Sequence, residues 1–298
     1  MEIFIEVLLP IALIFMGGYL LQKKQVLEIR SISAVALYIL TPALVFRTFY
    51  TTVPDRNYLI IVVFSIVFLV IMLLCNFIVA KIYKWDSKTV SGMNLATIFT
   101  NAGNYGAPLI LFAFGEEAFA FAVIYMVVQS LLMNTFGVYV ANRSNMDARG
   151  AIRISLKMPV MYALFLGLAL QYLNIQMGDS YLGAIDLLAD SAIPVVMVIL
   201  GMQLATISVK SFQWALVGYG TILRLVLSPI IAYVLTLMMP ASPTLAAVLI
   251  VSASMPSAAT TAMLAVQFDA NPKLVSSITL VTTVLSVPSL WILLSLLQ

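Results

Sequence analysis

The sequence predicts an all-α polytopic membrane protein with ten transmembrane helices, arranged as two inverted repeats of five. Three observations lead to this fold class. Of the 298 residues, 63% are hydrophobic and only 9% are charged, a composition that a single water-soluble domain does not have. Apolar runs long enough to cross a bilayer follow one another with short linkers. Two of these runs, about 150 residues apart, are interrupted by polar residues, glycine or proline.

A membrane-spanning helix needs about 20 mainly apolar residues. This rule places ten spans, at residues 3–21, 32–50, 58–83, 90–112, 117–141, 152–172, 181–205, 213–239, 244–265 and 273–297. The chain then divides into a first five-helix repeat (1–141), a cytoplasmic linker (142–151) and a second repeat (152–298).

The basic residues predict the orientation. Twelve of the 15 lysines and arginines fall in the loops after odd-numbered spans or beside them. Because basic loops stay in the cytoplasm, we expect a multi-pass protein of the plasma (inner) membrane with both termini extracytoplasmic. The net charge of +3 comes without a basic tract, so no nucleic-acid partner is expected.

Weak internal similarity predicts the repeat. Phe15-Met16-Gly17 in span 1 resembles Phe165-Leu166-Gly167 in span 6, and Pro42 in span 2 corresponds to Pro194 in span 7. Five spans per half is an odd number, so the two halves must cross the bilayer in opposite directions. Interrupted helices at corresponding places of inverted halves indicate the binding site of a secondary transporter.

The interruption in span 4 is the strongest motif. Thr100–Pro108 contains two glycines, two asparagines and a proline, all unfavourable inside a helix, so we expect the helix to break over residues 100–108. Unpaired backbone groups at bilayer depth are tolerated only beside protein or a water-filled cavity. The corresponding stretch in span 9 is Ser252–Thr261. The two breaks together predict a cavity near the middle of the membrane.

The half-helices that follow the breaks would present free amide hydrogens and positive dipole ends to a common point, where a carboxylate can bind. Candidate substrate-binding residues are Asn101, Asn104, Tyr105, Gly106, Pro108, Ser254, Pro256, Ser257 and Thr260. The alternative is structural: glycine and proline only kink packed helices, and polar side chains bond across helix interfaces.

Four further polar residues lie within predicted spans and are supporting candidates. They are Gln129, Asn134, Gln203 and Arg224. Intramembrane charges usually face a cavity or a partner, so Arg224 is expected either to attract an anion or to hold a mobile helix. Its alternative is to snorkel toward a nearby span end.

The sequence contains little that indicates an enzyme. The chain has no histidine and a single cysteine, Cys75, which removes cysteine and histidine metal sites, internal disulfides and histidine as a catalytic base or proton shuttle. Asp186 and Asp190 form one acidic pair on a helical face, whereas a membrane prenyltransferase would need two such clusters for magnesium and diphosphate. We therefore expect no catalytic residue, no metal and no cofactor.

Asn101–Pro108 resembles the Asn-x-Gly-Asn-x-Gly-x-Pro signature of the auxin efflux carrier family, and Leu40–Phe46 and Ala192–Leu204 agree with that family. The resemblance implies a fold related to the bile acid sodium symporters. It further implies a dimerising scaffold from spans 1, 2, 6 and 7, and an elevator-like transport domain from spans 3–5 and 8–10. Organic anions would bind where spans 4 and 9 cross, with roles for Asn101, Asn104, Pro108 and Pro256.

The expected function is secondary transport of a small organic carboxylate by alternating access, in a homodimer within the lipid bilayer. Since every Asp and Glu lies at or near a span end, the sequence favours uniport driven by the membrane potential. A sodium-coupled symporter of the bile-acid type and a non-transporting membrane receptor are the alternatives. The identity of the anion, the coupling, the direction of transport and the oligomeric state stay open.

Overall fold

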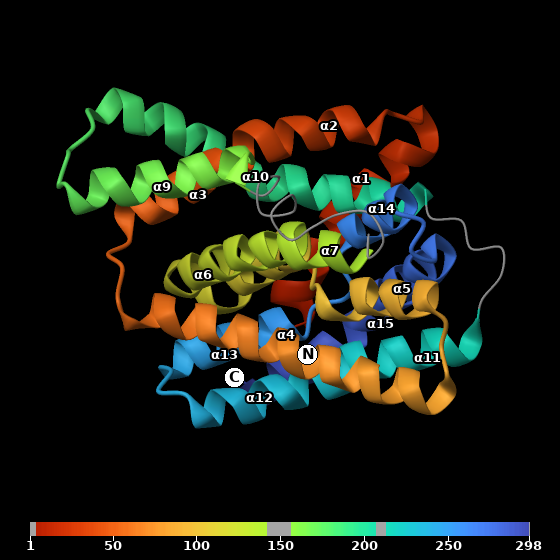
Figure 1. Cartoon of the computed structure of the whole chain (residues 1–298). Coiled ribbons are helices and arrows are strands. Elements are labelled where there is room, and N and C mark those ends of the chain that lie inside the picture. Colours follow the sequence, from red (N-terminus) through yellow and green to blue (C-terminus); the bar gives the residue numbers. More distant parts are fainter. Residues whose placement is uncertain (1–3, 142–155, 207–212, 298) are drawn as a thin grey trace.

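The computed structural model describes residues 4–141, 156–206 and 213–297, and these ranges are almost entirely helical (Figure 1). The predicted linker 142–151 and residues 152–155 of the second predicted repeat lie outside the described residues. In the first half, the α-helices and π-helical turns (η) are η1 (Phe4–Leu8), α1 (Leu9–Gln25), α2 (Ile29–Val35), η2 (Ala36–Leu40), α3 (Thr41–Thr51), α4 (Arg56–Tyr83), α5 (Ser87–Ile98), η3 (Ala102–Gly106), α6 (Ala107–Leu132), η4 (Met133–Gly137) and α7 (Val138–Ala141). In the second half they are α9 (Pro159–Tyr172), α10 (Asp179–Thr206), α11 (Trp214–Ile222), η5 (Leu223–Leu227), α12 (Ser228–Met238), α13 (Pro243–Ala253), α14 (Ala259–Gln267) and α15 (Pro272–Leu297).

Seven helical runs of the described chain are long and apolar enough to cross a membrane. They are Ile5–Gln25, Ile29–Thr51, Arg56–Tyr83, Ala102–Ala141, Asp179–Thr206, Trp214–Met238 and Pro272–Leu297. Two shorter apolar helices, Pro159–Tyr172 and Pro243–Ala253, accompany them. The expectation of an all-helical polytopic membrane protein is therefore confirmed.

The longest run, Ala102–Ala141, contains a sharp change of direction at Gly115. Gly115 has φ 78° and ψ −170°, a backbone conformation that residues with a side chain rarely adopt. No atom lies within 4 Å of the place a Cβ would occupy, so the glycine is required by its backbone angles and not by crowding. The kink separates the predicted spans 90–112 and 117–141.

Polar residues in the loops begin several helices. The Asp86 carboxylate accepts a hydrogen bond from the Thr89 amide at 2.9 Å and so caps the N-terminus of α5. Asp55 and Ser242 cap α4 and α13 in the same way. Each cap satisfies an amide that the first turn of a helix leaves free.

The two halves of the chain pack against each other through close helix contacts. α1 lies against α10, and α3 lies against α9 and α10 (Figure 1). A Cβ at Gly18 of α1 would lie 2.1 Å from the carbonyl oxygen of Val198 in α10. At Gly167 of α9 it would lie 2.8 Å from the carbonyl oxygen of Phe46 in α3. Small residues permit this backbone approach in membrane helix pairs.

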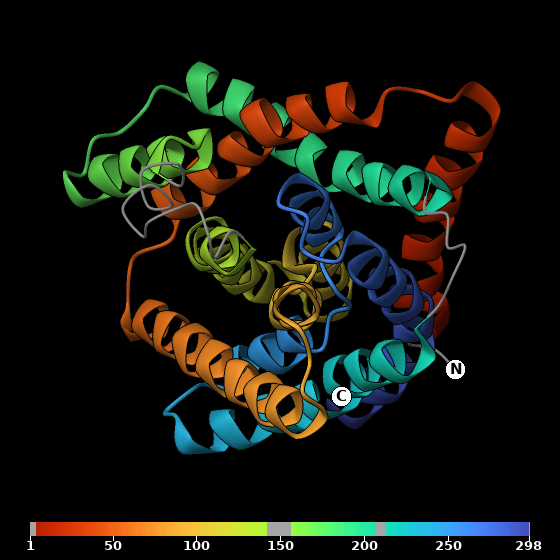
Figure 2. The ribbon, with the colours of Figure 1, turned by 45° about the vertical axis from the view of Figure 1, so that its right-hand side comes forward.

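The interrupted helices lie inside the bundle. Figure 2 shows α5 and α14 in the middle of the molecule, with α3, α9 and α10 on one side and α4, α11 and α12 on the other. Every residue from Ser91 to Ile98 of α5 is buried. Backbone left unpaired at the end of α5 therefore has to find its partners within the protein.

Candidate functional site

Two short extended segments pair in the centre of the molecule, at the ends of α5 and α13. The Asn101 amide donates to the Pro256 carbonyl at 2.9 Å, and the Ala258 amide donates to the Phe99 carbonyl at 3.1 Å. Between these hydrogen bonds, Thr100 and Ser257 form an antiparallel β-bridge. We call residues 99–101 and 254–258 together the crossing. The expectation that the breaks in spans 4 and 9 meet is confirmed.

The break in span 4 is shorter than the motif that predicts it. The helix stops after Ile98 and resumes at Ala102, so the expected break over residues 100–108 is wrong in its extent. Residues 102–106 form a π-helical turn, in which the Gly106 amide donates to the Asn101 carbonyl at 2.9 Å. Pro108 follows this π-helical turn at the start of α6, and its ring nitrogen has no hydrogen to donate to the turn before it.

Arg224 joins the ends of both helices that enter the crossing. Its side chain is fully buried, with 0% exposed, so it does not snorkel. The guanidinium donates to the Thr97 carbonyl at the end of α5 at 2.6 Å. It also donates to the Met255 carbonyl at 2.9 Å and to the Ala253 carbonyl at the end of α13. Carbonyls at helix C-termini have no partner within their own helix, so the guanidinium satisfies groups that the two breaks expose.

A cavity of about 180 Å³ lies against the crossing. One wall comes from the crossing and the helix starts that follow it, and from α6 and η4. The opposite wall comes from η2, α3, α10 and the start of α9. The lining residues are Leu37, Tyr38, Thr41, Leu44, Phe99, Thr100, Asn101, Ala102, Gly103, Asn104, Met126, Val127, Gln129, Ser130, Met133, Met158, Pro159, Val160, Ala192, Ile193, Val196, Ala258, Ala259 and Thr260. None of the residues in this lining carries a formal charge.

Two helix N-termini contribute to the cavity wall. The run that begins at Ala102 and the helix α14 that begins at Ala259 both start at the crossing, and their first residues are among the lining. The first amides of a helix have no acceptor within that helix, and the N-terminal end of its dipole is positive. The wall formed by the crossing therefore offers hydrogen-bond donors and positive potential without a charged side chain.

The Asn101 side chain lines the cavity with its hydrogen bonding incomplete among the described residues. It is only 4% exposed, and its Nδ2 atom has no hydrogen-bond partner in the described chain. A buried donor without a partner costs free energy, and such groups in native proteins usually have a ligand or water that completes them. Asn104, one turn later, also lines the cavity and is partly exposed.

Two other predicted residues reach the cavity. Gln129 lines it and donates a hydrogen bond from Nε2 to the Tyr125 hydroxyl at 2.9 Å. Thr260 lines it from the first turn of α14, with its hydroxyl 3.4 Å from the Met133 sulfur. Together with Asn101 and Asn104, these are the predicted site residues that the structure gathers around one space.

The remaining motif residues of span 4 lie away from the lining. Tyr105 does not form the expected aromatic wall: its ring packs edge-on against Phe15, with centroids 5.1 Å apart, and its hydroxyl accepts a hydrogen bond from Ser286 at 3.4 Å. Gly106 lies against the Met255 side chain, where a Cβ would come within 3.1 Å. Gly106 and Pro108 therefore shape the backbone and do not contact the cavity.

The span 9 residues Ser254, Pro256 and Ser257 belong to the crossing but point away from the lining. The Ser254 hydroxyl donates to the Ile250 carbonyl at 2.6 Å. The Ser257 hydroxyl accepts a hydrogen bond from Thr279 at 3.1 Å, and the Ser257 amide donates to the Thr282 hydroxyl at 3.2 Å. Pro256 contributes its carbonyl to the Asn101 amide. Ser257 thus holds the extended segment against α15, whereas Ser254 bonds within α13 and Pro256 bonds to the segment from span 4.

Two supporting candidates do not reach the cavity. The Asn134 side chain donates to the Ser130 carbonyl, one turn back on the same helix, at 2.8 Å. Gln203 lies on α10 with its Oε1 atom buried and without a partner in the described chain. Neither belongs to the lining.

Several residues of the site are not predicted from the sequence. Tyr38, Thr41 and Ser130 line the cavity, and Thr282 fixes the crossing from α15. Each is a hydroxyl within a mainly apolar run, a pattern that membrane helices also use for ordinary packing. Thr41 carried the only available signal, because it precedes Pro42 in the stretch that resembles the carrier family.

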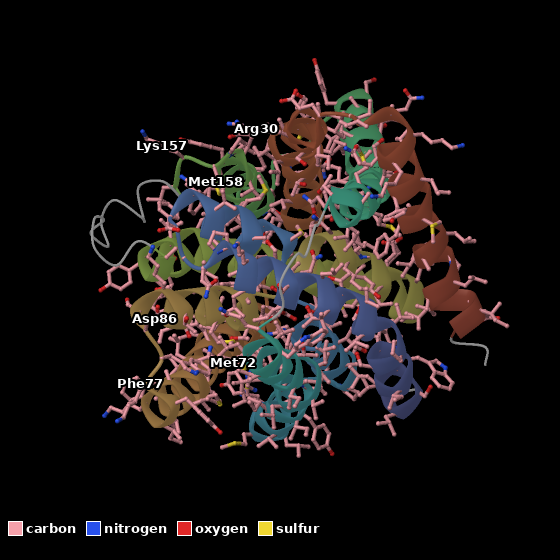
Figure 3. The ribbon with its side chains drawn as sticks, turned by 90° about the vertical axis from the view of Figure 1, so that its right-hand side faces the viewer. Arg30, Met72, Phe77, Asp86, Lys157 and Met158 are labelled. Atoms are coloured by element: carbon pink, nitrogen blue, oxygen red, sulfur yellow. The ribbon has the colours of Figure 1, made fainter. Side chains whose placement is uncertain are left out.

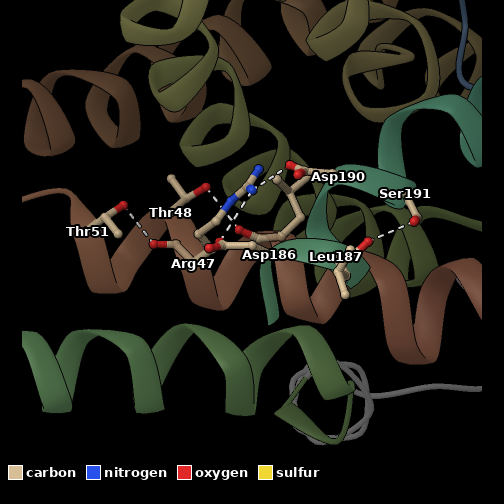
Figure 4. A network of polar contacts seen from close by, with 8 residues as sticks. Arg47, Thr48, Thr51, Asp186, Leu187, Asp190 and Ser191 are labelled. Atoms are coloured by element: carbon tan, nitrogen blue, oxygen red, sulfur yellow. Dashed lines mark hydrogen bonds and ion pairs between the residues drawn. The ribbon is translucent and has the colours of Figure 1, made fainter. Parts of the chain in front are cut away.

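The acidic pair has a partner that the sequence did not reveal. Arg47 of α3 lies between Asp186 and Asp190 of α10, with Nη1 2.6 Å from Asp190 Oδ1 and 3.5 Å from Asp186 Oδ1 (Figure 4). The pair thus forms a salt-bridge network between helices of the two halves. A salt bridge between the two helices accounts for the spacing of the acidic pair.

Comparison with known proteins identifies the family. The family model described as "Membrane transport protein" matches twice, to residues 3–150 and to residues 148–294, which also suggests an internal repeat. An uncharacterized transporter from Methanothermobacter thermautotrophicus is 25% identical over 301 residues, covering 96% of this chain and 95% of the relative. The uncharacterized transporter MJ1031 from Methanocaldococcus jannaschii is 24% identical over 300 residues, covering 96% and 97%. The chain belongs to this membrane transport protein family, the auxin efflux carrier family that its motifs resemble, and is a transporter and not an enzyme.

Proposed function

We propose that the protein is a secondary transporter of small organic anions, carboxylates, across the plasma membrane, and that the substrate binds in the cavity at the crossing. One observation carries this proposal: two helix N-termini and the Asn101 Nδ2 atom, which has no partner in the described part of the chain, converge on a cavity without a charged lining residue. Donors fixed by backbone hydrogen bonds bind a carboxylate with little reorganisation.

The proposed arrangement is ten spans in two inverted five-helix repeats. α5 runs toward the crossing and α14 runs away from it, yet their outer ends lie together, because Lys88 and Asp269 form an ion pair there. α13 and α6 pack against each other beyond the crossing. This opposite pairing of half-helices supports an inverted repeat with the domain bounds 1–141 and 152–298.

The proposed mechanism is elevator-type alternating access. Spans 1, 2, 6 and 7 would form the scaffold, and spans 3–5 and 8–10 the moving domain. The cavity lies between helices assigned to the two groups, with the crossing on one wall and α3 and α10 on the other. A sliding displacement of one wall along the other would expose the bound anion to either side. A homodimer through the scaffold is part of this proposal.

The proposed orientation places both termini outside the cytoplasm. Lys157, which precedes α9, lies on the same side of the bundle as Asp86, which precedes α5 (Figure 3). Two of the basic loops thus share one side, as the distribution of lysine and arginine requires for a cytoplasmic face.

The test is binding and uptake by purified protein. A thermal-shift screen against mono- and dicarboxylates, with and without sodium, identifies ligands that stabilise the folded state. Saturable uptake of the best ligand into proteoliposomes then separates a carrier from a receptor. Asn101→Ala should weaken binding by about tenfold or more, because a charge-assisted hydrogen bond contributes about 1.5–3 kcal/mol.

Asn134→Ala is the matched control, because Asn134 bonds within its own helix and does not line the cavity. It should leave uptake within about twofold of the wild type, since this hydrogen bond within one helix contributes about 1 kcal/mol to folding and makes no contact with the cavity. Equal uptake by the Asn101 and Asn134 variants would refute the assignment of the site.

A further inference from the structure

A buried arginine lies behind the crossing without an acidic partner. Arg224 is the one charged side chain among the buried residues of the described chain. The ion pairs found in the described ranges involve Arg47 and Lys88, and none involves Arg224. An arginine stays protonated in a protein, and an uncompensated charge inside a membrane is costly.

The partners of Arg224 are the negative ends of two helices. Thr97 lies at the end of α5, and Ala253 and Met255 lie at the end of α13, and the guanidinium binds a carbonyl of each. A helix C-terminus behaves as about −0.5 of an elementary charge, so two of them together offset a guanidinium charge.

The positive ends of the following helices are then left uncompensated. The run from Ala102 and the helix from Ala259 each contribute about +0.5 of an elementary charge at the cavity wall. All four helix ends meet within the crossing and sum to about zero, so the charge that remains there is that of Arg224. A ligand with one negative charge balances it, a neutral ligand leaves it unbalanced, and a dianion exceeds it.

We propose that Arg224 is a positioning residue that fixes both helix ends at the crossing and sets the charge of the site. The cavity consequently selects organic anions with a single negative charge over dianions and neutral analogues. The inference rests on the proposed function and specifies its substrate class. Arg224 is not among the residues that line the cavity, so it acts on the ligand through the helix ends and its charge.

The geometry distinguishes arginine from lysine at this position. The bonds to the three carbonyls come from three different guanidinium nitrogens, Nε, Nη1 and Nη2. A lysine ammonium is a compact point charge on a flexible chain and cannot reproduce that planar fork. Arg224→Lys should therefore keep the preference for one charge while weakening binding of every ligand.

The experiment measures dissociation constants of three probes of similar length: hexanoate, adipate and hexanamide. Wild-type protein should bind hexanoate at least about tenfold more tightly than adipate or hexanamide, because a fixed positive charge at low dielectric favours one anion. Arg224→Gln should reduce the ratio of hexanoate to hexanamide affinity to about one, whereas Arg224→Lys should retain most of it.

Gln129→Glu tests the same charge balance if the Arg224 variants fail to fold. This change is isosteric, and it adds one negative charge to the cavity wall. It should lower the ratio of hexanoate to hexanamide affinity by at least about tenfold. Arg47→Gln, which removes an arginine that does not line the cavity, is the control and should leave the ratio within about twofold.

The outcomes separate the inference from the proposed function. If wild-type protein binds none of the three probes, both are refuted. If it binds hexanoate but neither Arg224→Gln nor Gln129→Glu changes the affinity ratio, only the role of Arg224 is refuted. If the wild type binds adipate as tightly as hexanoate or more tightly, selection for a single charge is also refuted. The proposed function as a carboxylate carrier would then still stand.

Discussion

The Asn101 amide and the Pro256 carbonyl lie 2.9 Å apart, although 155 residues separate them in the chain. This hydrogen bond and its neighbour from Ala258 to Phe99 join the two interrupted helices by backbone alone. The Asn101 side chain takes no part in this pairing, and its Nδ2 atom has no hydrogen-bond partner among the described residues, at a point where the first amides of two helices also lack acceptors within their own helices.

Gly18→Ala should destabilise the protein, because its Cβ would lie 2.1 Å from the Val198 carbonyl oxygen and would force α1 away from α10. Overpacking of this kind costs about 1–3 kcal/mol or more. Gly17→Ala is the control, since no atom lies within 4 Å of its Cβ position. Thermal unfolding in detergent should show a lower midpoint for the Gly18 variant alone; equal midpoints would contradict the close contact.

Thr282→Val should loosen the crossing, because it removes the acceptor of the Ser257 amide at 3.2 Å. An unsatisfied buried amide costs about 1–3 kcal/mol. Thr283→Val serves as the comparison, since the Thr283 hydroxyl donates only to the Thr279 carbonyl of its own helix. Hydrogen exchange of the residues around Ser257 should accelerate in the Thr282 variant; similar exchange in both variants would contradict the role given to Thr282.

Asp86→Ala should destabilise α5 by about 1 kcal/mol, the usual value of an N-cap. Asp86→Asn should restore most of this loss, because an asparagine oxygen also accepts the Thr89 amide hydrogen. Hydrogen exchange in the first turn of α5 measures the difference. Protection that is the same in all three proteins would contradict the cap.

The same residue gives a pH dependence. Hydrogen bonds from Thr89 hold the pKa of the Asp86 carboxyl below its usual value. Because the pKa is lower in the folded state, the stabilisation is complete above the unfolded pKa of about 3.9 and is lost as the pH falls through the folded value. The stability difference between wild type and Asp86→Asn should therefore change only under acidic conditions, and a change near neutral pH would contradict this origin.

Arg47→Gln should have a small effect, because Asp186 and Asp190 are substantially exposed and such ion pairs are worth about 0–1 kcal/mol. The difference from wild type should shrink as salt is added. Magnesium should not stabilise the wild-type protein, since the acidic pair already holds a guanidinium. Stabilisation by magnesium that Asp186→Asn abolishes would instead indicate a metal site.

The sequence was sufficient to predict the interrupted helices and their meeting point. Gly103, Gly106 and Pro108 marked the break because they are unfavourable in a helix interior. They did not locate it, because a π-helical turn accommodates these residues and the helix resumes at Ala102. Local helix propensity therefore predicted that the helix breaks. Backbone pairing with residues 254–258 sets the length of the break to three residues.

Side-chain direction was the part that the sequence could not predict. Tyr105 and Ser257 lie within the predicted motifs, yet they turn toward α15. Arg224 was recognised as unusual, but its three carbonyl partners come from two other helices and carry no sequence signal. Such roles depend on which residues tertiary packing brings together, and single-sequence patterns do not contain that information.

The most direct test of the central claim asks whether a carboxylate occupies the cavity at the crossing. The chain's single cysteine, Cys75, can be replaced by alanine and a new cysteine introduced as Asn104→Cys, or as Gln176→Cys in an exposed loop for comparison. The rate of alkylation by N-ethylmaleimide is then measured with and without hexanoate. The account predicts that saturating hexanoate slows alkylation at position 104 and leaves position 176 unchanged. Hexanoate that binds the protein without slowing alkylation at position 104 would contradict it.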